Sequence, residues 1–301
     1  AILCLMFGLE LGGSEGWAWD SAKTVSLFVG SGVLLALFLW AESVAKDPII
    51  KLGLFRKRLF MSSMAISLLY GGVMIAGATY IPIFIQGVFH KTATETSSVL
   101  TPMMLGVVLS SQIGGRVASL FRYRDVMLVS VFTLLIGSCL LGFAMDTGTS
   151  RLVITLFMVI IGLGMGVSFS LLNISTLGSV PPQYKGSASS LITFFRTIGS
   201  ALGVTVFGTL QKHHFQQGIQ EVPNLSPELA EQIKGGQALL DPTIQERMGL
   251  APDVVNGLLA KLADSITYIF QWSVLLPALA VVFVLLMGSA RMEKAAPGPQ
   301  K

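Results

Sequence analysis

Charged side chains are scarce in this chain of 301 residues, because Asp, Glu, Lys and Arg together make up only 12% of it. A typical soluble domain carries about 25%. Hydrophobic residues make up 52%, and the mean hydropathy is +0.73. This balance is typical of an integral membrane protein rather than a soluble one. The net charge of +4 is small, so no nucleic-acid partner is expected, and the informative property is where the charges lie.

Several chemical signatures are also missing. The chain has two cysteines, Cys4 and Cys139, and both fall in apolar stretches, which excludes a disulfide framework or a zinc site. It has no glycine-rich phosphate loop ending in Lys and Ser or Thr, which argues against an ATP-driven motor. The apolar stretches contain no Ser-His-Asp, Cys-His or di-His set. We therefore predict no enzyme activity, no cofactor and no metal.

Long apolar stretches dominate what is present. Each could cross a hydrocarbon core of about 30 Å at about 1.5 Å per residue. Strands of a membrane barrel would be about ten residues long with alternating polarity, so the stretches predict an all-α integral membrane fold. The seven stretches are 24–43, 60–83, 97–115, 126–145, 152–177, 188–210 and 266–290. A shorter one, 1–12, is expected to be the end of a further helix, as if the chain began inside it.

Lys and Arg are distributed unequally between alternate loops. Cytoplasmic loops of membrane proteins are the positive ones, which predicts a multi-pass protein of the plasma (inner) membrane with a cytoplasmic C-terminus. The positive set is Lys46, Lys51, Arg56, Lys57, Arg58, Arg116, Arg122, Arg124, Lys185, Arg291, Lys294 and Lys301, and the short loops of the other set hold Lys23, Lys91 and Arg151. The long connection 211–265 is then extracytoplasmic. Its segment 253–264 is predicted to be an amphipathic helix on the membrane surface.

Arg196 is the only Lys or Arg well inside an apolar stretch. On insertion scales a buried Arg costs at least about 2.5–3.5 kcal/mol at a helix centre. It is therefore either a structural anchor or a positive charge on a substrate or proton path. Asn173 is a second candidate, either for a cavity or for a hydrogen bond between helices. No Asp or Glu lies deep in a complete stretch, so a proton-coupling carboxylate is expected outside this chain.

Further residues could line a substrate path or serve helix packing. Aromatic, thioether and amide side chains would form a soft, adaptable wall, although packing in the core is the alternative for each. The wall candidates are Tyr70, Met74, Tyr80, Gln86, Phe169 and Phe195. The pairs Gly162 with Gly166 and Gly199 with Gly203 have the small-xxx-small spacing that lets membrane helices approach closely. These glycines are predicted to pack helices, and to let them slide in a conformational cycle.

Several segments together resemble the fourteen-helix drug:proton antiporters of the major facilitator superfamily. The most specific is the run Gly186-Ser187-Ala188-Ser189-Ser190-Leu191 followed by Arg196-Thr197-Ile198-Gly199-Ser200-Ala201-Leu202-Gly203, and the others are Ile81-Pro82-Ile83-Phe84-Ile85-Gln86, Leu54-Phe55-Arg56-Lys57-Arg58-Leu59-Phe60, Pro102 and Trp17. The loop after the third stretch is similar to the family's Gly-x-x-x-Asp-Arg motif. It keeps Gly115, Arg116, Arg122 and Arg124 but has Ser119 and Leu120 at the Asp-Arg positions, so no charge relay is expected there.

The resemblance implies an organisation for the whole chain. Residues 1–43 would be a partial and a complete inserted helix, 44–59 a cytoplasmic link, 60–290 the C-terminal six-helix half including the 211–265 connection, and 291–301 a cytoplasmic tail. It also implies export of amphipathic drugs or related small molecules, driven by the proton-motive force through alternating access. The implied partners are the substrate, protons, the lipid bilayer and a missing N-terminal half, without which the chain should not transport.

Two alternatives stay open from the sequence. The same fold could export a siderophore, an amino acid or a lipid-like metabolite, which the composition of the candidate wall does not separate from drugs. A non-transport membrane scaffold is the other, and the glycine-rich stretches and Arg196 argue mildly against it.

Overall fold

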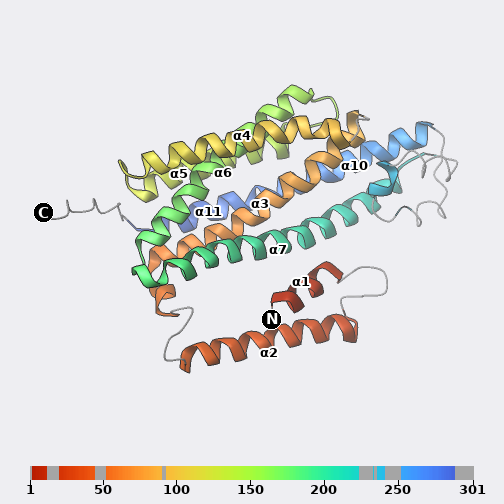
Figure 1. Cartoon of the computed structure of the whole chain (residues 1–301). Coiled ribbons are helices and arrows are strands. Elements are labelled where there is room, and N and C mark those ends of the chain that lie inside the picture. The colour runs from red at the N-terminus through yellow and green to blue at the C-terminus, as the bar shows by residue number, and fades with distance from the viewer. Residues whose placement is uncertain are drawn as a thin grey trace, which may run out of the picture.

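The computed structural model describes residues 2–11, 20–44, 52–89, 93–223, 233, 236–240 and 252–288. Every regular element in these ranges is a helix, so the predicted all-α fold class is confirmed for this part of the chain (Figure 1). The α-helices are α1 (Ile2–Leu11), α2 (Ala22–Val44), α3 (Arg58–Phe89), α4 (Ala93–Val117), α5 (Tyr123–Phe143), α6 (Arg151–Gly178), α7 (Lys185–Ile219), α10 (Pro252–Ser273) and α11 (Leu275–Leu286). Three short 3-10 turns accompany them, at Leu52–Arg56, Pro182–Tyr184 and Gln237–Leu240.

Six stretches of the described residues are long and apolar enough to cross a membrane, judged by length and composition. They are Arg58–Phe89, Thr96–Val117, Tyr123–Phe143, Arg151–Gly178, Pro182–Ile219 and Asp253–Leu286. The last combines α10 and α11, which are separated at Val274. Pro277 lies just after this break. Since proline has no backbone N–H to donate, it weakens the helical hydrogen bonding there.

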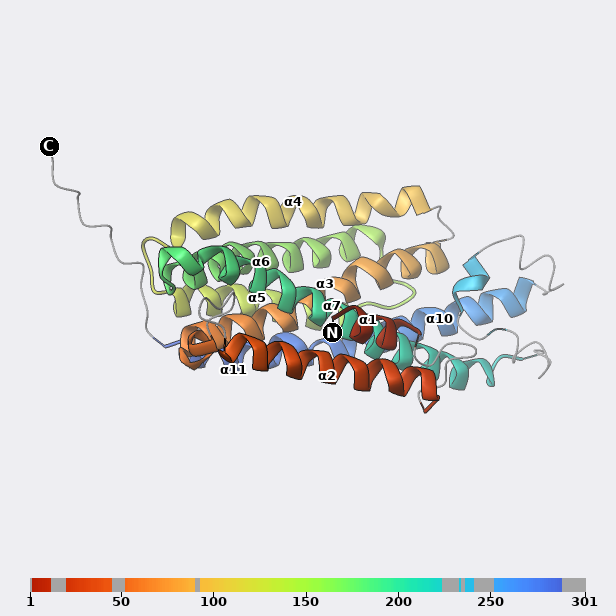
Figure 2. The ribbon, with the colours of Figure 1, turned by 60° about the horizontal axis from the view of Figure 1, so that its bottom comes forward.

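Helix α3 lies at the centre of the bundle. It contacts α7, α10, α11 and α6, and more weakly α4. Helix α6 is packed between α4 and α5, and α10 and α11 both contact α5. Figures 1 and 2 show these helices running roughly along one common direction, with α4 and α7 on opposite sides of α3. Such an arrangement buries the apolar side chains of α3 on nearly every side.

Helices α1 and α2 lie outside this bundle. They pack on one another, and α1 also contacts α7 (Figure 1). Gly8 of α1 lies against the ring of Phe28, where a Cβ would be 3.3 Å from the ring. Much of α2 is exposed, including Val29 and Val33. The pair is therefore an attachment to the bundle rather than part of its core.

Basic side chains, most of them exposed, gather where α3, α5 and α7 begin and α4 and α6 end. We call this the basic end, and it is made of Arg56, Lys57, Arg58, Arg116, Arg122, Arg124 and Lys185. Neighbouring helices run in opposite directions, which brings residues far apart in sequence to the same end. Lys57 there donates a 2.7 Å hydrogen bond from Nζ to the carbonyl of Ser179. The tail 291–301 and residues 45–51 of the link lie outside the described residues.

The structure corrects the expected connection 211–265 at both of its ends. Helix α7 continues to Ile219 and α10 already begins at Pro252. The prediction that 253–264 lies on the membrane surface is wrong. Leu258 and Leu262 are 0% and 1% exposed because they face the bundle, where α10 packs on α7, α5 and α3. The run Ser226-Pro227-Glu228 has the pattern of a helix start, with Ser as N-cap and Pro at the first helical position, but it lies outside the described residues.

Candidate functional site

Three of the predicted site residues lie in a row across three helices. We call this row of Arg196, Phe169 and Tyr70 the ladder. The guanidinium carbon of Arg196 on α7 lies 4.9 Å from the centre of the Phe169 ring on α6. That ring lies 6.2 Å, centre to centre, from the ring of Tyr70 on α3, at an interplanar angle of 58°. Arg196 and Phe169 are half-buried, whereas Tyr70 is completely buried. Tyr70 therefore supports the surface that the other two residues form.

The hydroxyl of Tyr70 begins a chain of buried hydrogen bonds. Tyr70 Oη lies 2.6 Å from Ser168 Oγ, and Ser168 Oγ lies 2.6 Å from Ser130 Oγ on α5. Ser130 Oγ also donates to the carbonyl of Gly164, at 2.5 Å. All three side chains are at most 2% exposed, and buried hydroxyls need partners of this kind. The chain links α3, α6 and α5 and fixes the position of the Tyr70 ring.

The contact with Phe169 does not offset the cost of the charge on Arg196. A cation–π contact contributes about 0.5–2 kcal/mol, against an insertion cost of at least about 2.5–3.5 kcal/mol. No described carboxylate forms an ion pair with Arg196. The printed sequence of α6 and α7 contains no Asp or Glu at all. Among the described residues, the guanidinium of Arg196 thus has no anionic partner and lies beside an aromatic ring.

Asn173 lies one helical turn beyond Phe169 on α6. Its Nδ2 donates a 2.9 Å hydrogen bond to the carbonyl of Phe169, so the amide folds back on its own helix. The side chain is half-buried. Residues four apart share one face of a helix, so Asn173 and Phe169 belong to the same surface of α6. Within the described part of the chain, the amide makes no hydrogen bond to another helix.

Backbone-to-backbone contact between α3 and α7 occurs at Arg196 itself. A Cβ built on Gly71 of α3 would overlap the carbonyl oxygen of Arg196, and one built on Gly199 of α7 would overlap that of Leu68. A Cβ on Gly203 would lie 2.8 Å from the side chain of Ile75. Only glycine permits such an approach. Two serines bridge the same helices: Ser200 Oγ donates to the Gly71 carbonyl at 3.0 Å, and Ser67 Oγ to the Ile192 carbonyl at 2.7 Å.

The glycines of α6 serve two different neighbours. Cβ atoms on Gly162 and Gly166 would overlap the α4 carbonyls of Met103 and Val107. A Cβ on Gly164 would lie 2.9 Å from the carbonyl oxygen of Ser130 on α5. Residues two apart on a helix point to nearly opposite sides. The sequence Gly-Leu-Gly-Met-Gly therefore allows α4 and α5 to pack closely on either side of α6.

Phe195, Tyr80 and Gln86 lie away from the ladder, whereas Met74 lies one helical turn beyond Tyr70 on α3. Phe195 packs with Phe194 and Phe55, at ring-centre distances of 5.6 Å and 6.3 Å, in a small apolar cluster around the link into α3. Met74 is half-buried against the main core. Tyr80 is 4% exposed and its hydroxyl faces Gly208 of α7. Gln86 lies sixteen positions beyond Tyr70, which is about 24 Å along α3.

The predicted loop motif surrounds the turn between α4 and α5. Gly115 approaches Ser170 of α6, where a Cβ would be 3.3 Å from the serine hydroxyl. Arg116 and Arg122 are exposed. Arg124 Nε lies 3.8 Å from the carboxylate of its neighbour Asp125. The described motif therefore contains one adjacent pair of opposite charges and no contact between its arginines and a carboxylate of another helix.

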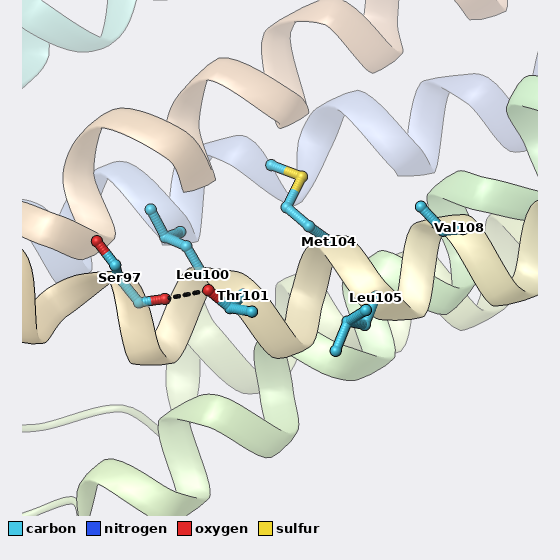
Figure 3. Close-up of a pocket in the computed structure, with 6 residues that line it drawn as sticks. All are labelled: Ser97, Leu100, Thr101, Met104, Leu105 and Val108. Carbon is cyan, nitrogen blue, oxygen red and sulfur yellow. Dashed lines mark hydrogen bonds between the residues drawn. The ribbon is translucent and has the colours of Figure 1, made fainter.

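A surface pocket lies apart from this site. It has a volume of about 380 Å³ and runs along α4, with Thr101 donating a 2.8 Å hydrogen bond to the Ser97 carbonyl (Figure 3). The lining residues are Ser97, Leu100, Thr101, Met104, Leu105 and Val108. No titratable group lines it, so it offers mainly apolar contact. Arg196 is not part of it.

Residues 1–204 match the family model of the Major Facilitator Superfamily. The chain belongs to this superfamily. It is 36% identical to Multidrug resistance protein 3 of Bacillus subtilis over 302 aligned residues, covering 98% of this chain and 58% of that protein. It is 28% identical to the Multidrug transporter protein MdtP of the same organism, covering 97% of this chain and 57% of that protein. The chain thus spans a little more than half the length of these relatives.

Solved structures support the superfamily fold. A bacterial homologue of the human lysosomal transporter Spinster, in an inward-facing and occupied conformation, matches with a TM-score of 0.62 at 16% identity. The match covers 94% of this chain and 63% of that one. The inward-facing and unoccupied form matches with a TM-score of 0.59. The family match thus places the chain in a superfamily of multi-pass membrane proteins, and some of its relatives are named for drug resistance and efflux.

Sequence reasoning did not select Ser130 as a site residue. Its signal was present but weak: Ser130, Leu134, Gly137 and Leu141 recur at helical spacing on one face of α5, and all four are buried. A serine on a packed face with glycine is a candidate for a hydrogen bond between helices. The identity of its partner, Ser168, depends on how α5 and α6 are rotated against each other, which a single sequence does not specify.

Proposed function

We propose that this chain is part of a proton-motive-force-driven exporter of amphipathic drugs or related small molecules, which works by alternating access. The observation that carries the proposal is the 36% identity to a multidrug resistance protein over 98% of the chain. The resemblance of the sequence to the fourteen-helix antiporters agrees with it. In this proposal the chain supplies the C-terminal six-helix half together with inserted helices.

The ladder of Arg196, Phe169 and Tyr70 is the proposed substrate-facing part of this half. It combines a polar group with aromatic surface, which suits small-molecule sites in general. In superfamily transporters, alternating access is a rocking of packed helical units around a central site. Contacts through Gly71 and Gly199 adjoin Arg196, so a ligand at Arg196 would act directly on the packing between α3 and α7.

Proton coupling needs a titratable group, and the three helices around Arg196 supply no carboxylate. The described parts of α3, α6 and α7 contain no Asp or Glu. We propose that the coupling carboxylate belongs to a preceding N-terminal half, which also completes the cavity. The chain by itself should then bind no proton in the membrane interior and should not transport.

The proposed orientation places the basic end in the cytoplasm of a bacterial cell. It can be tested with single cysteines in a background in which Cys4 and Cys139 are replaced. Leu120→Cys lies in the turn between α4 and α5 and is 74% exposed, and Thr147→Cys lies between α5 and α6. In intact cells an impermeant maleimide should label only Thr147→Cys. Labelling of Leu120→Cys alone would reverse the orientation.

Transport itself is tested with the complete gene product in inverted membrane vesicles. Adding a drug to energised vesicles should release protons from them, and an uncoupler should abolish drug accumulation. A comparison with vesicles lacking the protein provides the baseline. Drug accumulation that persists after the proton gradient has collapsed would contradict proton-driven export, and proton release with amino acids or siderophores alone would change the substrate class.

A further inference from the structure

Arg196 carries a positive charge for which the described residues provide no counter-charge. The ion pairs that the structure shows involve other residues: Arg124 with Asp125 at the start of α5, and Lys261 of α10 with Glu221, which follows α7. Arg196 instead lies in the middle third of α7, at a point where α3 and α7 are in backbone contact. Its side chain contacts the ring of Phe169. An aromatic ring attracts a cation, but it cannot accept the pair of parallel hydrogen bonds that a guanidinium can donate. Among the described residues, Arg196 is therefore a cation without a paired anion.

The shape of the guanidinium restricts what can complement it. Its five N–H donors form a rigid planar fork, and it has no acceptor. The guanidinium carbon lies 4.9 Å from the centre of the Phe169 ring, and no described carboxylate forms an ion pair with the guanidinium. A carboxylate matches the planar fork with two parallel hydrogen bonds, and such charge-assisted pairs are among the strongest polar contacts in proteins. An amine or quaternary ammonium would be repelled.

The surface next to the guanidinium is apolar and held in place. Phe169 packs against Tyr70, whose hydroxyl is fixed by Ser168 and, through it, by Ser130. Asn173 is also tied to this turn of α6 through the Phe169 carbonyl. A ligand that reaches Arg196 therefore finds an ordered aromatic surface beside the charge. An acidic group attached to an apolar body would use both features at once.

We propose that Arg196 and Phe169 bind the carboxylate and the adjoining apolar part of an amphipathic organic anion. The inference rests on the proposed export function and deepens it, because it names the charge class of the cargo. A phosphate of a lipid headgroup has related chemistry and could reach the same guanidinium. The experiment below separates that source from a soluble organic anion.

Two fluorescent probes that differ in one group provide the test. They are 4-(1-pyrenyl)butanoate and 4-(1-pyrenyl)butanamide, which share the pyrene ring and the alkyl chain. The complete gene product is placed in nanodiscs of pure phosphatidylcholine, and binding is measured by fluorescence anisotropy with the signal of empty discs subtracted. We expect the carboxylate to bind about tenfold or more tightly than the amide, in line with a bidentate charge-assisted pair.

Substitutions at Arg196 assign the preference to that residue. Arg196→Gln should bind both probes with equal affinity, near that of the amide for the unmodified protein. Arg196→Lys should keep a smaller preference, because an ammonium retains the charge but not the planar fork. Arg56→Gln removes an exposed arginine at the basic end and serves as the matched control, with the full preference retained. Size-exclusion profiles identify any variant that does not fold, and Arg196→Lys keeps the test open if Arg196→Gln fails.

Each outcome bears on the proposal. Equal binding of the two probes by the unmodified protein, or an undiminished preference in Arg196→Gln, would overturn it. Loss of the preference when phosphatidylglycerol is added to the discs would assign Arg196 to lipid headgroups and also overturn it. Transport of the probes is measured separately in vesicles. Selective binding of the carboxylate without any transport would support the anion site and count against the export function. Transport of both probes without charge preference would support the export function and count against the anion site.

Discussion

Helices α2 and α3 are both apolar, with 23 and 32 residues, yet they occupy very different positions. Two thirds of the most apolar window of α3 is buried, at 67%. On α2, Val25, Val29, Val33 and Leu37 are between 44% and 58% exposed. Hydropathy alone therefore does not distinguish a central helix from a peripheral one in this protein.

The surroundings of the glycine and serine residues distinguish the central helix α3 from the peripheral helix α2, which hydropathy does not. A Cβ on Gly30 or Gly32 of α2 would meet no atom within 4 Å, whereas one on Gly71 of α3 would overlap the backbone of α7. Ser26 of α2 donates to the Lys23 carbonyl of its own helix, but Ser67 of α3 donates to α7. Small residues hold a helix in the bundle only when a second backbone lies against them.

The largest expected effect comes from adding a methyl group at the closest crossing. Gly199→Ala places a Cβ on the Leu68 carbonyl, and the two helices must move apart to accommodate it. Overpacking of this kind typically costs about 1–3 kcal/mol and sometimes more. We expect Gly199→Ala to lower the thermal midpoint of the complete protein in detergent by several degrees, and to reduce the monodisperse fraction in size-exclusion chromatography.

The matched control is the same substitution on the peripheral helix. Gly30→Ala meets no neighbour, and alanine is favoured over glycine within a helix by about 0.5–1 kcal/mol. It should leave the midpoint unchanged or raise it slightly. Similar losses in both variants would show that the contact between α3 and α7 is not specially close, and would remove the physical basis of the comparison.

Much of the fold could be predicted from the sequence because lipid imposes a simple length rule on apolar segments. The centres of α3 to α7 agree with the predicted stretches. Their ends do not, since α7 runs nine residues beyond the expected Leu210 to Ile219. The apolar face of 253–264 suits a membrane surface and a protein interior equally well. Only packing against α7 decided between them.

The candidate site could be predicted only in part. Arg196 was identifiable because a charge in an apolar stretch is costly wherever the helix lies. Its contact with Phe169 joins α6 to α7 and depends on helix rotation, which periodicity does not give. For the same reason Phe195, adjacent to Arg196 in sequence, points to a different cluster with Phe55. Neighbouring positions on a helix face different directions.

A smaller effect is expected from the hydroxyl chain behind Phe169. Ser168→Ala removes hydrogen bonds to both Tyr70 and Ser130 and leaves two buried hydroxyls without that partner. An unsatisfied buried polar group costs about 1–3 kcal/mol, and Ser130 keeps its bond to Gly164, so we expect a loss of about 1–2 kcal/mol of stability. A thermal melt of the complete protein measures it.

Ser111→Ala is the control for this substitution. Ser111 lies on α4 and its hydroxyl donates only to the Val108 carbonyl of the same helix, so little change is expected. In a double-mutant cycle, Tyr70→Phe combined with Ser168→Ala should lose less than the sum of the single losses, because both remove one shared hydrogen bond. Strict additivity would show that the two hydroxyls are not coupled.

The smallest effect is expected at a contact in water, away from both helices compared above. Glu221 follows α7 and accepts a hydrogen bond from Lys261 Nζ of α10. This hydrogen bond, together with the charge of Lys261, lowers the pKa of the Glu221 carboxyl. A carboxyl whose pKa is lower in the folded protein stabilises the fold above its unfolded pKa, and this contribution is lost as the pH falls through the folded value.

Glu221→Gln should therefore lower the thermal midpoint slightly at pH 7, by less than either interior substitution, because exposed pairs are screened by solvent. The difference from the unmodified protein should shrink as the pH falls below the ordinary glutamate range and vanish once the carboxyl is protonated in both states. Lys261→Gln should show the same pH dependence, and the double variant no further loss at pH 7. If the difference in thermal midpoint persisted unchanged at acid pH, Glu221 would act through packing rather than charge. This exposed contact would then resemble the buried hydrogen bonds that Ser67 and Ser200 make between α3 and α7.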